Sequence, residues 1–262
     1  MKKNKQIVLI SPRVLGSKGQ VRKAPPPFGI AVLAASLKNK GYENVKLIDA
    51  VVENYDNIEP VKDDNNFTTY GLSDKDMVKL VQSFNPDFIG ISALFSSQTE
   101  CAFSLAQILK KETPNVPIAM GGNHATECRQ EVMKEESCID YILAGEADLT
   151  FPDFIDKYFT GSNFYDVPGL LYRNNNKIME NPLPKAVVDL DSLPYPAWHL
   201  YDMQKYYDIG MPHNPFLKSR EFGQIITSRG CPAKCYFCSV PDFNGNTFRY
   251  FSADRVIDDV NR

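Results

Sequence analysis

Three cysteines near the end of the chain could hold a metal centre. Cys231, Cys235 and Cys238 lie within eight residues in the spacing C-x3-C-x2-C, so one tight loop can turn all three sulfurs inward. Thiolates select zinc, Cu(I) or an iron–sulfur cluster. A structural zinc site needs four ligands, typically as paired Cys or His units, and the nearest histidine, His213, has no partner beside it. Three thiolates without an evident fourth ligand favour a [4Fe–4S] cluster with one open iron. A zinc site and unligated thiols are the alternatives.

The residues around these cysteines resemble the signature of the radical S-adenosylmethionine (radical SAM) family. That signature is C-x3-C-x2-C with an aromatic residue just before the last cysteine, which here is Phe237. The resemblance implies that Cys231, Cys235 and Cys238 ligate the cluster and that backbone near Phe237 contacts the adenine of S-adenosylmethionine. It further implies that an electron from the cluster cleaves this cofactor to a 5′-deoxyadenosyl radical. A flavodoxin or ferredoxin could donate that electron.

The composition is that of a soluble globular protein. The chain has 262 residues, 43% of them hydrophobic and 23% charged, which suffices for one large or two ordinary domains. A formal net charge of −3 provides no basic field for nucleic acid. The basic N-terminus is followed by only a short apolar run, residues 7–10, so we expect neither a signal peptide nor a membrane span. The sequence therefore predicts a cytoplasmic protein, and the resemblance implies that its partners are small-molecule cofactors.

The first 160 residues alternate short β-branched runs with amphipathic segments. Five such repeats imply a doubly wound, flavodoxin-like parallel sheet of five strands in an α/β fold. Ser73 and Asp49 are expected to act as cap or turn residues, and residues 53–72 to form an irregular insertion. The expected strands are 6–11, 45–49, 87–93, 117–120 and 139–144, and the expected helices are 30–41, 73–84, 99–112, 126–136 and 150–158.

The loops after these strands are candidates for ligand binding. In doubly wound sheets, ligands bind beyond the carboxyl ends of the strands, near the switch in strand order, and glycines let the backbone approach a ligand closely. His124 could form hydrogen bonds within its loop or contact a cofactor. Glu146 could cap the next helix or contact a ligand. The candidate residues at these positions are Ser92, Gly121, Gly122, His124, Gly145 and Glu146.

These loops resemble the cobalamin-binding domain that precedes the cluster domain in one large branch of radical SAM proteins. The resemblance covers most of residues 7–158 and implies a bound cobalamin. Many cobalamin proteins carry Asp-x-His-x-x-Gly, whose histidine ligates cobalt. None of His124, His199 and His213 has an Asp two residues earlier, so no such ligand is expected. A domain that kept the fold and lost the cofactor is the alternative. The matching pieces are residues 26–29, 33–35, 121–126 and 145–146.

The remaining residues predict a connection and the start of a second domain. Residues 169–180 indicate a β-hairpin, and 183–224 a Pro- and aromatic-rich linker that wraps over a neighbouring surface. Residues 223–228 should form a strand and 252–261 a helix, capped by Ser252. The expected parts are a cobalamin-binding-like domain (1–160), a hairpin and linker (161–222), and the first βα unit of an incomplete (β/α) radical SAM barrel (223–262).

The resemblance implies an enzyme that uses cobalamin, S-adenosylmethionine and a [4Fe–4S] cluster. The reaction class implied is radical methylation of an unactivated carbon or a related rearrangement, which follows from the family alone. The alternatives are a non-catalytic module that binds cobalamin, the cluster or both, and a zinc-stabilised scaffold. Because only one βα unit is recognised, we expect the chain to be the N-terminal portion of a longer enzyme. Residues that select the substrate would then lie in later barrel strands and at the domain interface.

Overall fold

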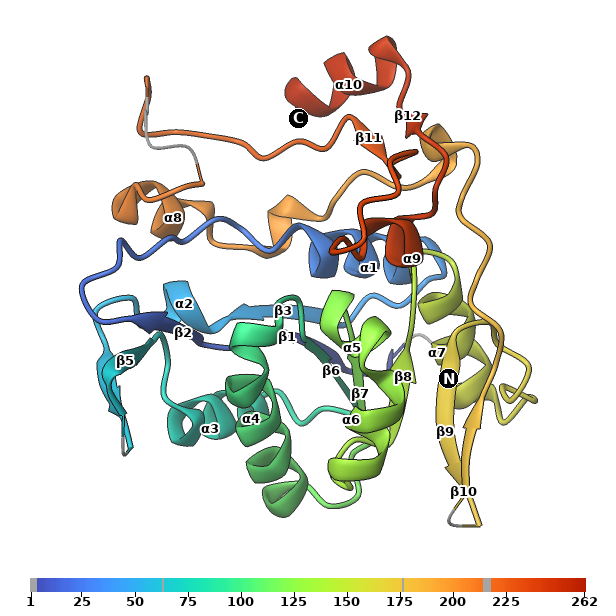
Figure 1. The fold of residues 1–262 in the computed structure, drawn as a ribbon, viewed down its shortest axis with the longest axis horizontal. Helices are drawn as coiled ribbons and strands as arrows, with labels where there is room; N and C mark the ends of the chain where they lie inside the picture. The colour runs from blue at the N-terminus through green and yellow to red at the C-terminus, as the bar shows by residue number, and fades with distance from the viewer. Residues whose placement is uncertain (1–3, 63, 176, 214–217) are drawn as a thin grey trace.

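The computed structural model describes residues 4–62, 64–175, 177–213 and 218–262. A mostly parallel sheet forms its centre (Figure 1), with strands β1 (Ile7–Ser11), β3 (Val45–Asp49), β6 (Phe88–Ser92), β7 (Ile118–Gly121), β8 (Tyr141–Leu143), β9 (Leu170–Asn174) and β10 (Lys177–Glu180). Their order is β10-β9-β8-β7-β6-β1-β3. The five strands from β8 to β3 are parallel, whereas β9 and β10 continue the sheet in antiparallel pairing.

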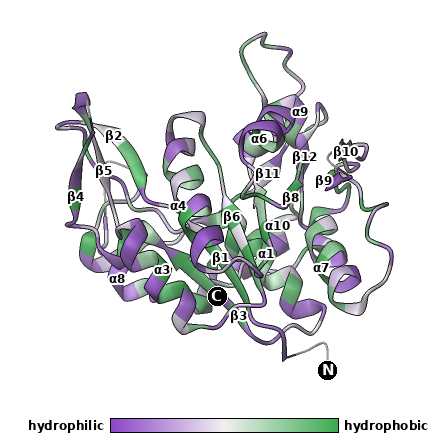
Figure 2. Cartoon of the chain, turned by 90° about the horizontal axis from the view of Figure 1, so that it is seen from below, coloured by the Kyte–Doolittle hydropathy of each residue, from purple (hydrophilic) through white to green (hydrophobic). Residues whose placement is uncertain are grey.

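Helices cover both faces of this sheet, and alternate residues of each strand separate the core into two layers. Ile7 and Leu9 pack on one face with α1 and α7, while Val8 and Ile10 pack on the other with α3, α4 and α6. Strands buried on both faces are continuous apolar runs, which appear as hydrophobic ribbons between the helices in Figure 2. The helices are α1 (Phe28–Asn39), α3 (Asp74–Ser83), α4 (Thr99–Glu112), α6 (Arg129–Glu135) and α7 (Thr150–Thr160).

Most of the elements expected in the first 160 residues form close to their expected positions. Ser73 caps α3 by accepting a hydrogen bond from the Asp76 amide, as expected. The expected helix over 126–136 is instead two short helices, α5 (Asn123–Glu127) and α6, which meet at Cys128. The sheet has seven strands rather than five because β9 pairs with β8. This pairing satisfies backbone groups that an edge strand would leave open.

Residues 53–72 are not an irregular insertion. β4 (Ile58–Val61) and β5 (Asp64–Tyr70) form a second, antiparallel sheet with β2 (Val14–Ser17). Arg13 anchors this sheet, since its Nη1 lies 2.6 Å from Glu59 and its Nε 3.2 Å from Asp74. Asn and Asp favour turns over strands, so the Asp and Asn residues at the start of β5 did not indicate the strand that forms there by pairing with distant residues.

The Pro-rich linker wraps over α1, as expected. The Ala197 amide donates to the Ala31 carbonyl at 3.0 Å, and the Tyr201 hydroxyl donates to the Pro27 carbonyl at 2.8 Å. The linker also contains a helix that periodicity did not indicate. Its regular elements are α8 (Met203–Ile209) and the short 3-10 turns Leu190–Ser192 and Trp198–Leu200.

The expected strand over residues 223–228 does not form. Only β11 (Ser228–Arg229) is a strand there, and it pairs in antiparallel fashion with β12 (Arg249–Tyr250). The Phe251 amide donates to the Thr227 carbonyl at 3.0 Å, but in the described part of the chain residues 223–226 have no ladder partner, and an apolar run without a partner does not become a strand. α9 (Val240–Asn244) and α10 (Ala253–Val260) complete this region. Ser252 caps α10 as expected.

No helix within the described ranges combines the length and the apolar character required to cross a membrane.

A buried acid joins the linker to the sheet. Asp49 ends β3 and caps α2 (Ala50–Glu53) by accepting from the Val51 amide at 3.1 Å. It also accepts from the Tyr206 hydroxyl of α8 at 3.0 Å, and both side chains are buried. Burial raises the pKa of Asp49 to about 7, against the lowering effect of these two hydrogen bonds. Asp49 is therefore a cap residue, as expected, and also a docking point for α8.

Asp49 should make stability depend on pH. Its folded-state pKa exceeds that of the unfolded chain, so the folded state binds this proton more tightly. Its contribution is therefore fully present at low pH and declines from about pH 4 to about pH 7. We expect Asp49→Asn to flatten the pH dependence in this window, measured by urea unfolding at several pH values. Parallel curves for the variant and the original chain would contradict this assignment.

Gly122, directly after β7, is required by a close backbone approach. Its φ is 107°, and a Cβ there would lie 2.6 Å from the Ala93 carbonyl oxygen. We expect Gly122→Ala to lower the free energy of unfolding by about 1–3 kcal/mol, measured by urea denaturation. For Gly29, in the first turn of α1, no atom of the described residues lies within 4 Å of such a Cβ, so Gly29→Ala is the matched control and should be neutral or stabilising. Equal effects would contradict the steric explanation.

Candidate cofactor site

The loops after β6, β7 and β8 begin at one level on one edge of the sheet. Ser92 lies opposite Gly121, and Gly121 lies opposite Leu143, in the register of the parallel pairs. The strand order switches beside them, because β1 has β3 on one side and β6 on the other. Ligands of doubly wound sheets bind at such a switch. The structure thus brings together six of the residues expected to bind a cofactor: Ser92, Gly121, Gly122, His124, Gly145 and Glu146.

Hydrogen bonds hold the loop after β7 against the loop after β6. The His124 amide donates to the Ala93 carbonyl at 3.1 Å, and the His124 ring Nδ1 lies 2.9 Å from the Ser96 hydroxyl. Partial burial lowers the pKa of His124, which favours the neutral imidazole at neutral pH. His124 is therefore a hydrogen-bonding residue within its loops, and its contact with a cofactor stays a prediction.

Thr126 links the loops after β7 and β8. Its hydroxyl donates to the Gly122 carbonyl at 2.9 Å and accepts from the Gly145 amide at 3.0 Å. Gly145 has φ 81°, and a Cβ there would lie 3.0 Å from Pro184 of the linker. Thr126 belongs to one of the matching sequence pieces, but nothing in the sequence indicates that it bridges two loops.

The three cysteines lie in the loop between β11 and α9. They are free thiols, Cys235 exposed and Cys231 and Cys238 half-buried. Within the described ranges, no three His, Cys, Asp or Glu side chains are arranged to hold a metal ion, so the three sulfurs do not converge in this structure. The donor set itself fits an iron–sulfur cluster with an open iron, because three free thiols share one short loop.

The cysteine loop is fixed at its beginning and exposed at its tip. Gly230 has φ 82°, and a Cβ there would collide with the Thr247 carbonyl oxygen. The Cys231 amide donates to the Gly245 carbonyl at 3.3 Å. Phe237, the residue expected near adenine, is 78% exposed. The tip of the loop therefore presents its aromatic side chain to solvent.

The cysteine loop and the loop after β7 are neighbours. α9 begins two residues after Cys238 and packs beside α5, which begins directly after Gly122 (Figure 1). Burial raises the pKa of Glu127 in α5, and Asp242 in α9 raises it further, which reflects the close approach of the two helices. The structure therefore places the candidate cluster ligands next to a loop of the sheet edge.

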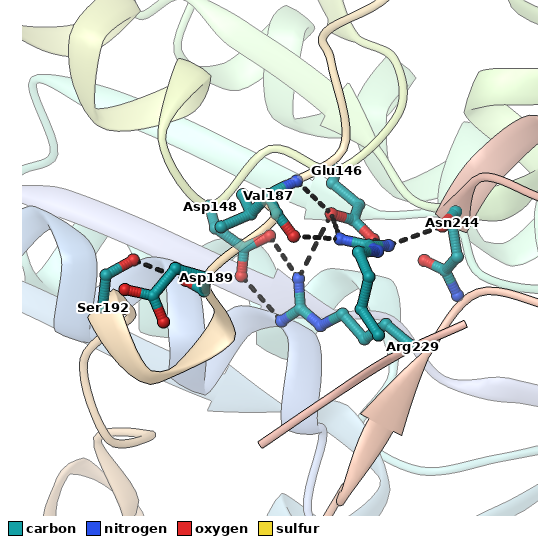
Figure 3. A network of polar contacts seen from close by, with 8 residues as sticks. Glu146, Asp148, Val187, Asp189, Ser192, Arg229 and Asn244 are labelled. Carbon is teal, nitrogen blue, oxygen red and sulfur yellow. Dashed lines mark hydrogen bonds and ion pairs between the residues drawn. The ribbon is translucent and has the colours of Figure 1, made fainter. Parts of the chain in front are cut away.

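Two arginine–carboxylate pairs join the loop after β8 to the strands that flank the cysteines (Figure 3). Arg229 contacts Asp148 through two hydrogen bonds of 2.8 and 2.9 Å. Arg249 donates to both carboxylate oxygens of Glu146, at 3.0 Å for Oε2. Although burial opposes its charge, the contact with Asp148 raises the pKa of Arg229 above its ordinary value.

Glu146 therefore does not cap the following helix. α7 begins at Thr150 without a side-chain cap, and the Glu146 carboxylate accepts from Arg249 and from the Val187 amide. The cap was one of the two roles expected from the sequence, and Arg249 displaces it because a buried guanidinium requires a carboxylate partner. Sequence patterns indicate neither Arg229 nor Arg249, since their partners are far away in the chain.

The chain is similar in sequence to known proteins. Residues 18–155 match the B12 binding domain family. The chain is 31% identical over 278 residues to the cytidylyl-2-hydroxyethylphosphonate methyltransferase of Streptomyces wedmorensis, in an alignment that covers 98% of this chain and 52% of that protein. The chain thus spans about half the length of this curated relative.

Two solved structures have a similar fold. One is the cobalamin-dependent S-adenosylmethionine radical enzyme OxsB with aqua-cobalamin and S-adenosylmethionine bound, with a TM-score of 0.72 and 17% identity over 99% of this chain and 31% of that one. The other is the radical S-adenosylmethionine methyltransferase TsrM from Kitasatospora setae with cobalamin and a [4Fe–4S] cluster bound, with a TM-score of 0.65 and 15% identity over 98% of this chain and 45% of that one. With residues 18–155 in the B12 binding domain family and the three-cysteine signature beside them, the chain belongs to the radical SAM superfamily and carries an N-terminal cobalamin-binding domain.

Proposed function

We propose that this chain is the cobalamin- and cluster-binding part of a radical SAM methyltransferase. The observation that carries the proposal is the position of the three-cysteine loop beside the loops of the sheet edge, through α9 against α5 and through the two arginine–carboxylate pairs. When bound, the cluster and S-adenosylmethionine supply a 5′-deoxyadenosyl radical, and cobalamin supplies a carrier for a methyl group. The protein supplies the position and surroundings of these groups.

The cobalamin part of the proposal rests on the sheet edge. Taken in chain order, the five parallel strands have the order 2-1-3-4-5, which is that of flavodoxin-like sheets. We assign Ser92, Gly121, Gly122, His124 and Gly145 to the surroundings of the cofactor, because they gather at the switch in this order. The sequence lacks the Asp-x-His-x-x-Gly pattern, so cobalt would receive no histidine from that motif.

The cluster part rests on the cysteine loop. Cys231, Cys235 and Cys238 are assigned as the three thiolate ligands, and Phe237 as the residue whose backbone faces adenine. The open iron would be left for S-adenosylmethionine, because the loop supplies three thiols. We assign the domains as residues 1–160, 161–222 and 223–262, with the last the first βα unit of the cluster domain.

A binding module without turnover is the second candidate. The exposure of Cys235 and of the neighbouring aromatic ring favours it, because radical chemistry requires a site closed to water, and here the loop tip lies open. The coverage of only half of the methyltransferase relative is compatible with both candidates. Substrate and methyl acceptor are not assigned.

We expect anaerobic addition of iron and sulfide to give a [4Fe–4S] spectrum that changes when S-adenosylmethionine binds. Cys231→Ala, Cys235→Ala and Cys238→Ala should each lose the cluster, because each removes one of three thiolates. Cys101 lies buried in α4, away from this loop, so Cys101→Ala is the matched control and should keep it. The measurements are iron content, visible absorbance and EPR.

The product of the reaction separates the candidates. Formation of 5′-deoxyadenosine from the reduced, cluster-containing chain would support the enzyme. If the cluster forms but its spectrum does not change with S-adenosylmethionine, and no 5′-deoxyadenosine is produced, the result would support the binding module. Stoichiometric zinc with no visible absorbance after iron and sulfide would contradict both and indicate a zinc scaffold.

A further inference from the structure

Four side chains that join the loop after β8 to residues 228–262, here called the cysteine unit, form one buried group. We call Glu146, Asp148, Arg229 and Arg249 the arginine clamp. Their side chains are between 3% and 11% exposed. The two carboxylates come from one loop, and the two guanidiniums come from β11 and β12 (Figure 3). The clamp therefore joins elements far apart in the chain at a single point.

The geometry of β11 and β12 makes the two pairs interdependent. Arg229 and Arg249 are directly opposite each other in the antiparallel register, so their side chains project from the same face. Two like charges in that position repel each other. Arg229 Nη1 also lies 3.7 Å from Glu146, so this carboxylate faces both guanidiniums. Loss of either carboxylate would leave a buried positive charge without its partner.

Stability alone does not explain such a group. A buried ion pair can often be replaced by apolar side chains without loss of stability, whereas the removal of one partner is costly. What two bidentate pairs provide is a defined orientation, because a guanidinium and a carboxylate meet in one plane with two parallel bonds. The clamp thus allows β11 and β12 fewer orientations relative to the loop after β8 than apolar packing would allow.

The clamp holds both ends of the cysteine loop. Arg229 immediately precedes Gly230 and Cys231 at the start of the loop. Arg249 donates to the carbonyl of Asn244, where α9 ends after the loop, and to the carbonyl of Val187 in the linker. Both ends of the loop are therefore held in place through arginines that bind Glu146 and Asp148.

The carboxylates are in turn connected to the candidate cobalamin loops. Glu146 comes directly after Gly145, whose amide donates to Thr126, and the Thr126 hydroxyl donates to Gly122. Hydrogen bonds and the peptide bond between Gly145 and Glu146 thus connect the loop after β7 to the loop after β8, and this loop to the strands that flank the cysteines. These contacts connect the candidate cobalamin loops to the cysteine unit through few residues.

We propose that the arginine clamp is a positioning device that fixes the distance between the cluster and the cobalamin. This inference rests on the proposed function, since it requires both groups to bind. The four residues act through the loops that they join, so they are positioning residues rather than catalytic ones. Their loss should alter the geometry between the two groups while leaving each group bound.

The test measures the magnetic dipolar interaction between the reduced cluster and cob(II)alamin by EPR, in the full chain loaded with both. The original chain should give one well-defined interaction. Glu146→Gln and Arg249→Lys should lose that single value and give a broad distribution, because glutamine removes the charge and lysine cannot form two parallel bonds. Arg249→Lys keeps the buried positive charge paired, so it serves as the milder variant where Glu146→Gln folds poorly.

The matched control is a buried pair inside the N-terminal part. Asp74→Asn weakens the ion pair with Arg13, whose side chain is 16% exposed and lies away from the cysteine loop. It should lower stability and keep the single dipolar interaction. Clamp variants that bind both groups and retain the original interaction would overturn the proposal, and a control variant that loses it would do the same.

Hydrogen exchange tests the arginine clamp when the chain does not bind the cofactors. If the original chain binds neither group, the proposed function fails, but the clamp can still be tested. Amides of residues 230–247 should then exchange about tenfold faster or more in Glu146→Gln and Arg249→Lys, and at the original rate in Asp74→Asn. Unchanged exchange in the clamp variants would overturn the proposal independently of the cofactors.

Discussion

Burial of two arginines against two carboxylates is the constraint on which the cysteine unit depends. β11 and β12 contribute two residues each, and a two-stranded ribbon of that length has no stability of its own in water. α10 adds little, since Ile257 and Val260 on its apolar side are more than half exposed. Polar contacts with the loop after β8 and with the linker therefore hold the cysteine unit in position. Arg255 contributes through its bond to the Leu193 carbonyl.

The fold of the first 160 residues was largely predictable because its signals are local. β3 and α4 have the predicted bounds, and the other parallel strands differ by one to a few residues. A parallel strand buried on both faces must be an apolar run, and each helix shows its spacing within a few turns. β2, β4 and β5 were not predictable, because their pairing joins residues 14–17 to residues 58–70 and depends on Arg13.

The site was predictable from two signals, the spacing of residues within one loop and the position of loops directly after the parallel strands. The cysteines were found because C-x3-C-x2-C is a local pattern. The partner of Glu146 lies 103 residues away in the chain, so no local pattern could reveal it. Gly122 was expected to make room for a ligand, and the structure gives it a further reason, the Ala93 carbonyl. A glycine in a candidate binding loop can thus be required by the protein's own backbone.

The sequence pieces that resemble a cobalamin-binding domain also include residues that contact other parts of the protein. In the piece at 26–29, Pro27 accepts from Tyr201 and Phe28 packs edge-on against Trp198, both in the linker. In the piece at 145–146, Glu146 accepts from Arg249 of the cysteine unit. These two pieces therefore contact the linker or the cysteine unit, and the piece at 121–126 contains most of α5, which packs beside α9. These residues therefore have partners outside the sheet domain, so they hold the linker and the cysteine unit against it in addition to any role at a cobalamin site. Part of the sequence resemblance therefore reflects contacts between the sheet domain and the linker or cysteine unit. These contacts determine how the cysteine unit is oriented on the sheet domain.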